Sequence, residues 1–414
     1  MDTSSALDVA TVDIASHRRF KLGHLITHPV QYLAPLYRHL NRNPSIDLTV
    51  FFLSDFSLRS YHDSGFGTSV KWDVPLLGGY SHVFVPSIGG GDRVSFSRPW
   101  TYGFGNLLKH TSCEALWVAG WSSIPVLRGI VTAKRLGVKV LVSGDSHAGG
   151  PNLPSAWKSR TKRILFPRFF GLIDGFLAFS SSNRDYYLQY GVPAERIFLV
   201  PYCVDNVFFQ QECRKASASR DELRRELYLE PGRPVILYAS KLIERKRPVD
   251  LIDAYAQLSP DGKVEPKPYL LFVGEGEQVP RLRERASQLG WNSIRFLGFK
   301  NQRELPRYYD LCDVFVLAAQ YEGLATVIPE VMNAAKPVII TPAVGLGPDL
   351  VTDGQNGFIV PPCKPSVLAD KLRLLTENSE LATQMGRKSL ERVSTWNFQA
   401  DERGILEALE AIVA

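Results

Sequence analysis

Runs of apolar residues alternate with segments of helical periodicity along most of this chain, and this alternation constrains the fold more than any other feature. Strands that alternate with helices predict parallel sheets, because each parallel connection must cross back over the sheet. The alternation breaks between residues 201 and 232. We therefore predict two α/β domains, residues 1–206 and residues 207–396. The predicted strands are 22–26, 48–53, 115–118, 138–142 and 175–179 in the first domain, and 235–239, 269–273, 294–297, 314–317, 338–340 and 358–360 in the second.

The composition agrees with two hydrophobic cores. The chain has 414 residues, of which 45% are hydrophobic and 22% charged, and this balance is typical of globular proteins. Such a length exceeds one compact core and suffices for two. Residues 55–104 are rich in Ser, Gly and aromatic side chains and show no clear period, so we expect loops and irregular structure there.

The cysteines and the apolar segments indicate where the protein resides. The 5 cysteines are scattered and form no C-x-x-C pair, which is typical of reduced thiols rather than of a disulfide framework. Residues 1–19 have no continuous apolar core, which argues against a signal peptide. The most apolar stretch, 164–179, is interrupted by Pro167, Arg168 and Asp174 and cannot span a bilayer. We expect a soluble, cytoplasmic protein.

Basic residues gather in one segment, although the formal net charge is only +6. One interpretation of the segment 158–168 is a solvated helix face. Another is a surface that contacts anionic lipid or a phosphorylated acceptor, which would place the protein at the inner face of the membrane. We expect no nucleic-acid partner, since no nucleic-acid-reading module is visible. The basic residues of the segment are Lys158, Arg160, Lys162, Arg163 and Arg168.

The segment 313–362 carries the most chemical information. A strand, 314–317, leads through a loop into a helix for which Thr326 is the N-cap candidate, with Pro329 in the first turn. The free amides and the dipole of such a helix predict an anion site at the carboxyl edge of the sheet. Glu322 and Glu330 flank this site. Carboxylates repel phosphate, so we expect them to bind hydroxyl groups, those of a sugar on one side and of a ribose on the other.

This segment closely resembles the retaining glycosyltransferases of family 4, which have the two-domain GT-B architecture of two Rossmann-like, doubly wound domains facing across a cleft. Their E-G-x-G pattern, with a second Glu eight positions after the first, reads here Glu322-Gly323-Leu324-Ala325 and then Glu330. The resemblance implies that Glu322 holds the transferred sugar and Glu330 the ribose of the nucleotide. It further implies that the diphosphate faces the amides of Ala325, Thr326 and Val327. Two glycines of the family pattern are replaced here, by Ala325 and Ala335.

Residues 235–248 resemble the family's G-R-L-x-x-x-K-G element, in which an Arg and a Lys neutralise the departing diphosphate. Lys241 stands at the place of the Arg, and Lys246 at the place of the Lys. A lysine keeps the charge but loses the bidentate fork, for which Arg245 or Arg247 would compensate. Fixed cations at this place stabilise the negative charge that develops on a leaving nucleoside diphosphate.

Three further matches extend the resemblance. Gly274 belongs to a V-G-x-G turn, and Gly298 and Phe299 to the segment that lines the nucleobase mainly through backbone groups. In this fold the last helix, here residues 397–414, commonly crosses back to the first domain. The resemblance is strong over residues 233–375, moderate over residues 165–206 and thin before residue 165.

The first domain supplies the candidates for the acceptor side. Its first loop departs from the glycine-rich form of typical relatives and resembles an H-P-x-Q-Y variant of the superfamily, with His28 and Gln31 expected to face the cleft. His28 would donate to the sugar or the phosphate, the alternative being a structural role in the loop. Asp145 and His147 follow a predicted strand and are candidates for contacting acceptor or donor sugar, the alternative being a helix-capping Asp and a surface His. Trp121 would stack on a sugar face or fill the core.

The sequence therefore predicts an enzyme that moves a sugar from a nucleotide-diphosphate sugar to a glycan, lipid-linked saccharide or small molecule, as in polysaccharide biosynthesis. No D-x-D motif and no His/Cys ligand spacing is present, so we expect neither a metal nor another cofactor, with Lys241 and Lys246 acting instead. The resemblance implies retention of anomeric configuration. Two alternatives remain open: a sugar-nucleotide epimerase or hydrolase, and a non-catalytic nucleotide-sugar-binding subunit.

Overall fold

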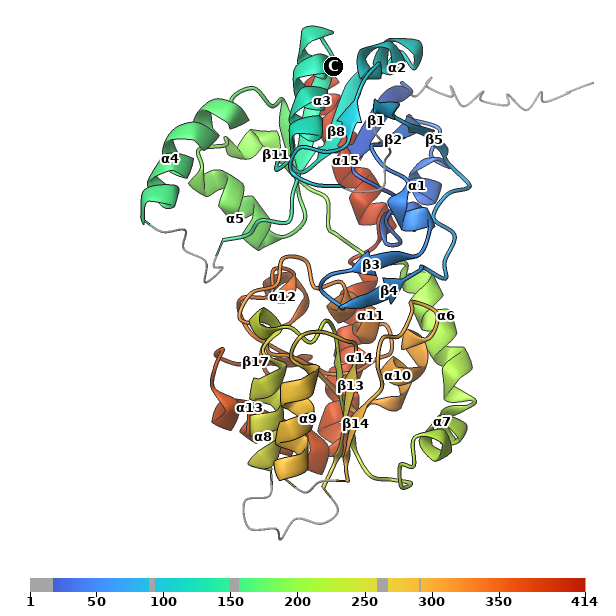
Figure 1. Cartoon of the computed structure of the whole chain (residues 1–414), viewed down its shortest axis with the longest axis vertical. Coiled ribbons are helices and arrows are strands. Elements are labelled where there is room, and N and C mark those ends of the chain that lie inside the picture. Colours follow the sequence, from blue (N-terminus) through green and yellow to red (C-terminus); the bar gives the residue numbers. More distant parts are fainter. Residues whose placement is uncertain (1–17, 89–93, 149–155, 259–266, 290–291, 414) are drawn as a thin grey trace, which may run out of the picture.

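The computed structural model describes residues 18–88, 94–148, 156–258, 267–289 and 292–413, with the backbone alone for 156–160. Two parallel sheets form the centres of two lobes, one above the other in Figure 1. Residues 1–17, on which the expectation about a signal peptide rests, lie outside the described part.

The first sheet has seven strands in the order β11-β10-β9-β8-β1-β2-β5. All neighbouring pairs in it are parallel, as in β1 and β2, where Phe20 lies opposite Ile46 and Ile26 opposite Phe52. The strands are β1 (Phe20–Ile26), β2 (Ile46–Phe52), β5 (Ser81–Phe84), β8 (Ala115–Ala119), β9 (Lys139–Ser143), β10 (Gly175–Ala178) and β11 (Ile197–Leu199).

Helices and short hairpins surround this sheet, and apolar clusters cover both of its faces. Parallel strands that are covered on both sides read as continuous apolar runs, which explains why most of them were visible in the sequence. The helices are α1 (Leu33–Leu40), α2 (Phe104–His110), α3 (Ile124–Arg135), α4 (Ala156–Phe170) and α5 (Ser181–Gln189), with the 3₁₀ turns η1 (Phe56–Leu58) and η2 (Ala194–Arg196). The hairpins are β3 (Tyr61–Asp63) with β4 (Thr68–Val70), and β6 (Ser87–Ile88) with β7 (Trp100–Thr101).

The second sheet has six parallel strands in the order β14-β13-β12-β15-β16-β17. These are β12 (Val235–Ala239), β13 (Tyr269–Val273), β14 (Ile294–Phe296), β15 (Val314–Leu317), β16 (Val338–Ile340) and β17 (Gly357–Ile359). Around them lie α6 (Asn206–Ser217), α7 (Arg220–Glu226), η3 (Glu244–Lys246), α8 (Pro248–Ala256), α9 (Val279–Gln288), α10 (Leu305–Leu311), α11 (Val327–Met332), α12 (Gly347–Leu350), α13 (Pro365–Glu377) and α14 (Ser379–Ser394).

The last helix, α15 (Phe398–Val413), packs on the first sheet although it follows the second lobe in sequence (Figure 1). Ile405 and Leu409 belong to the core cluster that also contains residues of β1 and β2. Gly404 permits this contact, because a Cβ there would lie 2.0 Å from the carbonyl oxygen of Leu199. The chain thus crosses between the lobes twice. At these crossings the Trp396 indole donates to the Tyr202 carbonyl at 3.2 Å. The domain boundary near residue 207 stays a prediction.

The prediction of loops and irregular structure over residues 55–104 was partly wrong. This region contains β5, which pairs with β2 at the edge of the main sheet, and two small hairpins. β11 was also not predicted. These strands are short and only partly buried, so they lack the continuous apolar run that marks a central parallel strand.

Candidate active site

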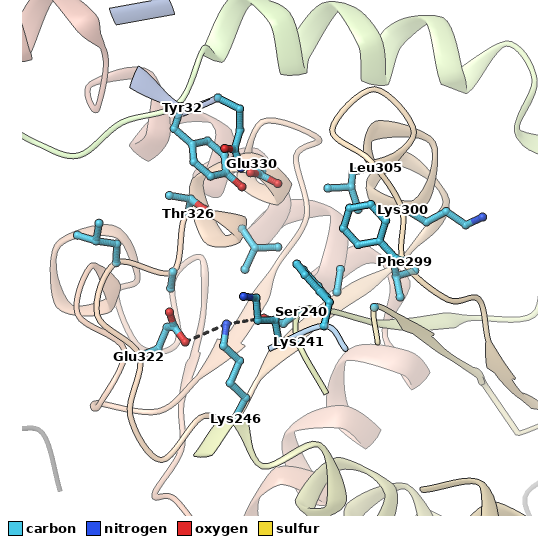
Figure 2. Close-up of a pocket in the computed structure, with 18 of the residues that line it drawn as sticks. Tyr32, Ser240, Lys241, Lys246, Phe299, Lys300, Leu305, Glu322, Thr326 and Glu330 are labelled. Atoms are coloured by element: carbon cyan, nitrogen blue, oxygen red, sulfur yellow. Dashed lines mark hydrogen bonds and ion pairs between the residues drawn. The ribbon is translucent and has the colours of Figure 1, made fainter. Parts of the chain in front are cut away.

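A cavity of about 360 Å³ lies between the two lobes and contains most of the predicted donor-binding side chains. It lies at the carboxyl ends of β12, β13 and β15, the edge at which doubly wound folds bind ligands. Figure 2 shows Glu322 and Lys246 on one side, Phe299 and Lys300 on another, and Glu330 near Tyr32. The predicted residues that line it are Lys241, Lys246, Gly274, Phe299, Glu322, Ala325, Thr326, Val327 and Glu330.

Lys246 and Glu322 form a nearly buried ion pair. Lys246 Nζ lies 2.9 Å from Glu322 Oε2 and donates to Ser240 Oγ at 2.6 Å, as the dashed lines in Figure 2 mark. Burial lowers the pKa of Lys246, and the carboxylate of Glu322 opposes this shift only in part. The lysine is placed by η3, a tight turn after β12 that ends in Arg247 with φ +51°.

Arg245 is a second cation at Glu322. Its guanidinium donates to Glu322 Oε2 at 3.1 Å and to the Tyr321 carbonyl at 2.9 Å. Arg247 instead pairs with Asp250 at 2.6 Å, within the first turn of α8. Of the two arginines considered as substitutes for the family's Arg, Arg245 is therefore the one that reaches the site.

The loop that carries Glu322 is fixed by backbone contacts. The amide of Glu322 donates to the Ala343 carbonyl at 3.1 Å, and the Gly345 amide donates to the Glu322 carbonyl at 2.8 Å. A Cβ on Gly345 would lie 1.9 Å from the carbonyl oxygen of Gly323, so only glycine fits there. A carboxylate held in this way has little freedom, as a positioned binding group requires.

Glu330 is buried in α11 between two tyrosines. The Tyr309 hydroxyl donates to Glu330 Oε2 at 2.5 Å, and Tyr32 lies beside the carboxyl group (Figure 2). Burial raises the pKa of Glu330 to about 7, against the opposing effect of the two tyrosine hydroxyl groups. Oε1 is buried without a hydrogen-bond partner. An orphaned acceptor beside a cavity is suited to receive a ligand hydroxyl.

Thr326 is at the predicted N-cap position of α11, with Pro329 in the first turn, but it lacks a side-chain capping bond. α11 begins at Val327, and Thr326 has helical backbone angles. Thr326 instead lines the cavity beside Tyr32. The preceding Ala325 has φ +51°, a conformation that glycine adopts without strain, which gives a physical reason for the glycine of the family pattern.

The glycine turns after β13 and β14 bring backbone close to backbone. A Cβ on Gly274 would lie 2.0 Å from the Ser240 carbonyl oxygen, and the Gly274 amide donates to the Gly298 carbonyl at 2.8 Å. Gly298 itself has φ +71° and does not line the cavity, whereas its neighbour Phe299 does. Lys241 lines the cavity and is ion-paired with Asp63 of β3, 2.7 Å away.

His147 joins the two lobes. Its ring stacks on Tyr321 with centroids 4.7 Å apart, and Nε2 lies 3.2 Å from the Glu322 carbonyl oxygen. The ring thus supports the loop of Glu322 and is not on the cavity wall. Asp145 packs on Gly323, where a Cβ would lie 3.2 Å from the Asp145 carbonyl oxygen. It also lines a second cavity of about 240 Å³ in the first lobe, together with Tyr202.

His28 and Trp121 lie away from the donor cavity. His28 packs on Phe56 with ring centroids 4.4 Å apart, and burial lowers its pKa to about 4. The cavity wall is formed by Gln31 and Tyr32 of the same loop. Trp121 packs edge-on against Phe170, in agreement with the core alternative.

Within the described part of the chain, no three His, Cys, Asp or Glu side chains are grouped so as to hold a metal ion. No described helix combines the length and apolar character needed to cross a bilayer. In the basic segment, the side chains of Lys158 and Arg160 lie outside the described part. Arg163 and Arg168 are exposed, as are the apolar Ile164 (53%) and Leu165 (55%) beside them.

Comparison with known proteins locates the similarity in the same part of the chain. Residues 219–392 match the family model of glycosyl transferases group 1. Within this region lie the loops of Lys241, Lys246 and Glu322 and the helix of Glu330. The α-D-kanosaminyltransferase of Streptomyces kanamyceticus is 28% identical over 199 residues, which are 48% of this chain and 50% of that relative. The match therefore spans half the length of this curated relative.

Solved GT-B structures match almost the whole chain. Anabaena HepE in complex with UDP and glucose has a TM-score of 0.67 at 19% identity, covering 95% of this chain and 100% of that one. Sucrose-phosphate synthase from Thermosynechococcus elongatus has a TM-score of 0.69 at 17% identity, covering 95% and 98%. At such identities the likeness establishes the fold. The predicted architecture, GT-B with two Rossmann-like domains, is confirmed.

Sequence reasoning missed several residues of the site. Tyr32 belongs to the H-P-x-Q-Y motif, so the motif contained its signal, but Tyr309 lies in a helix without any marker. Asp63 and Phe66 come from the segment 55–104, where no period or motif indicated a role. They reach the cavity only because the two lobes meet.

Proposed function

We propose that this protein is a retaining glycosyltransferase of family 4, of the variant with H-P-x-Q-Y in the first loop. It moves a sugar from a nucleotide-diphosphate sugar to a glycan, a lipid-linked saccharide or a small molecule, as in polysaccharide biosynthesis. One observation carries the proposal: Lys241, Lys246, Glu322 and Glu330 line one cavity between the lobes. Cations for a diphosphate and carboxylates for hydroxyl groups thus stand in the arrangement that a nucleotide sugar requires.

The leaving group is the nucleoside diphosphate, on which negative charge develops as the bond to the sugar breaks. Lys246 is nearly buried, and a cation in such a place stabilises developing charge more than an exposed one does. Lys241 supplies a second cation on the same cavity wall. These charges can perform the electrostatic work of a metal ion, and we propose that transfer requires none.

Glu322 binds hydroxyl groups of the transferred sugar, and Glu330 those of the ribose. Two cations, Lys246 and Arg245, hold Glu322 Oε2. A carboxylate neutralised by two cations is a weak nucleophile, which favours same-face attack over a double displacement. The acceptor hydroxyl bonds to the anomeric carbon as the phosphate oxygen leaves, and that oxygen takes the acceptor's proton.

The second cavity, which Asp145 and Tyr202 line, is the proposed side of the acceptor. Exposed apolar and basic residues of α4 favour contact with an anionic membrane over 158–168, at its cytoplasmic face. Flotation with phosphatidylglycerol vesicles tests this contact. Arg163→Glu should abolish co-flotation, with phosphatidylcholine vesicles as the control.

The test of the transferase is product analysis with purified protein and a panel of nucleotide sugars. UDP-glucose comes first, because HepE was solved with UDP and glucose. Acceptor-dependent release of nucleotide and a product of unchanged anomeric configuration support the proposal. Epimer formation or hydrolysis without acceptor would show an epimerase or hydrolase instead. Activity that vanishes with chelator and returns with Mn²⁺ would contradict metal independence.

Variants separate an enzyme from a binding subunit. Glu322→Gln and Lys246→Ala should each reduce kcat/KM by about 100-fold or more, the size typical of a lost electrostatic contact to the transition state. Lys139→Ala, at an exposed lysine of β9, is the matched control and should keep wild-type activity. Nucleotide-sugar binding without turnover under every acceptor condition would indicate a non-catalytic subunit.

A further inference from the structure

A hairpin of the first lobe contacts the nucleotide side of the cavity. β3 and β4 pair antiparallel, with Tyr61 opposite Val70 and Asp63 opposite Thr68 (Figure 1). At the tip, the amides of Gly65 and Phe66 donate to Asp63 Oδ1 at 2.8 and 3.0 Å. The tip is therefore an ordered turn built around a carboxylate.

This carboxylate binds the cation that the diphosphate would need. Lys241 Nζ lies 2.7 Å from Asp63 Oδ1 and 3.0 Å from Oδ2. Burial alone would raise the pKa of Asp63, but the hydrogen bonds from Lys241 and the tip amides leave it below its usual value. Gly65 allows the approach, because a Cβ there would lie 2.8 Å from Lys241 Nζ.

Two aromatic residues of the hairpin segment, Phe66 and Trp72, form the first lobe's part of the cavity wall on the nucleotide side. The Phe66 ring lies 4.9 Å from the Phe299 ring at 74°, and 4.7 Å from Lys241 Nζ. Trp72 also lines the cavity. In the second lobe the same end is formed by Phe299, Lys300 and Leu305, which Figure 2 shows together. Flat aromatic and apolar faces of this kind suit a nucleobase.

The segment after β4 is fixed to the second lobe at two further points. The Asn301 side chain donates to the Lys71 carbonyl at 2.6 Å, and the Arg303 amide donates to Asp73 Oδ2 at 3.1 Å. These bonds place Trp72, which lies between Lys71 and Asp73, next to the loop of Phe299. The hairpin segment is thus held over the cavity by contacts at both of its ends.

We infer that the β3–β4 hairpin and the segment after it supply the N-terminal half of the nucleotide site. Phe66 and Trp72 stack on the nucleobase. Asp63 is the ion-pair partner of Lys241 until the diphosphate takes its place. The inference rests on the proposed nucleotide-sugar site and assigns base recognition to both lobes. Asp63 is a competitor of the diphosphate, because Lys241 changes its partner when nucleotide binds. Phe66 is a specificity-determining residue, because it contacts the base and not the phosphates.

Calorimetric titration with UDP, ADP, GDP and inorganic pyrophosphate tests both roles. Phe66→Ala should weaken binding of the preferred nucleotide by about tenfold, the effect of one lost stacking contact, and leave pyrophosphate binding unchanged. Asp63→Asn should strengthen binding of nucleotide and pyrophosphate alike by about fivefold, as expected when a partly exposed ion partner is removed. Phe96→Ala removes an aromatic side chain that is 67% exposed and is the matched control.

The reference variant Lys246→Ala keeps this inference separate from the proposed function. If the wild type binds none of the nucleoside diphosphates, the proposed function fails. If the wild type binds one of them and Lys246→Ala weakens it, but Phe66→Ala does not, the hairpin has no part in base recognition. Equal weakening of nucleotide and pyrophosphate by Phe66→Ala would show a structural role only. Weaker binding by Asp63→Asn would overturn the exchange of partners. Circular dichroism of each variant checks the fold.

Discussion

Lys246 and Glu322 form an ion pair of 2.9 Å with side chains only 10% and 13% exposed. The pair is asymmetric, because Arg245 also contacts Glu322. Among the described residues, Lys246 has no second carboxylate partner, and its other hydrogen bond is to Ser240. Removing Glu322 therefore leaves two cations without their shared carboxylate, whereas removing Lys246 leaves a carboxylate that still pairs with Arg245. This asymmetry gives a stability test that does not depend on knowing the substrate.

Glu322→Ala should destabilise the protein more than Lys246→Ala. The first change leaves a nearly buried ammonium beside Arg245, and loss of one partner of a buried pair costs about 3 kcal/mol. The second leaves a carboxylate that Arg245 still neutralises, so we expect about 1 kcal/mol. Urea unfolding at neutral pH measures both. Equal losses would show that Arg245 does not compensate, and Lys139→Ala gives the background.

Glu330 should make stability depend on pH. Its pKa is raised from 4.5 to about 7 in the folded protein, so the folded state binds its proton more tightly than the unfolded state. This contribution is complete below pH 4.5 and is lost as the pH rises through 7. Its full size is about 3 kcal/mol. The free energy of unfolding should fall between pH 5 and pH 8 by a larger amount in the wild type than in Glu330→Gln.

The same residue should make nucleotide binding depend on pH in the opposite direction. Ribose hydroxyl groups donate to the ionised carboxylate, so the affinity for UDP should rise between pH 6 and pH 8. The second ionisation of phosphate, near a pKa of about 6, adds a rise of its own. Titrations of Glu330→Gln measure that background. An identical pH profile in both proteins would exclude Glu330 as the ribose ligand.

Ala335→Gly should stabilise the protein by about 1 kcal/mol, since glycine adopts left-handed backbone angles without the cost that Cβ imposes. Ala335 has φ +55° and lies after α11, outside the cavity wall. Thermal and urea unfolding measure the gain. Ala334→Gly, at the adjacent residue, is the control and should not stabilise. A loss of stability in Ala335→Gly would mean that the left-handed angle is not maintained in solution.

Gly274→Ala should reduce both stability and nucleotide affinity. Its Cβ would lie 2.0 Å from the Ser240 carbonyl oxygen, so the turn that carries Ser240 must shift, at a cost of about 3 kcal/mol. Gly232 also has a positive φ, +74°, but no atom lies within 4 Å of its added Cβ. Gly232→Ala therefore measures the backbone strain alone, about 1 kcal/mol. Equal effects of the two substitutions would contradict the close approach at Gly274.

The sequence by itself determined the two sheets and the positions of the main site residues. β12, β13, β15 and β16 have the predicted bounds, because a strand buried on both faces is a continuous apolar run with polar residues or turns at its ends. The motifs around Glu322 and Lys246 could also be recognised in the sequence, because each is a continuous stretch of the chain. A strand that ends in a loop at the carboxyl edge of a parallel sheet brings such residues together in any fold of this class.

The tertiary structure alone decided which residues complete the site. Asp63 and Lys241 are 178 positions apart, and His147 and Glu322 are 175 apart. No local propensity carries information about such pairs, because they exist only once the lobes have packed against each other. The same holds for the neutralisation of Glu322 by two cations and for the burial that shifts the pKa of Glu330. Residue type and order specify which groups are available. Packing between distant segments decides their charge state, their partners and the cavity that they share.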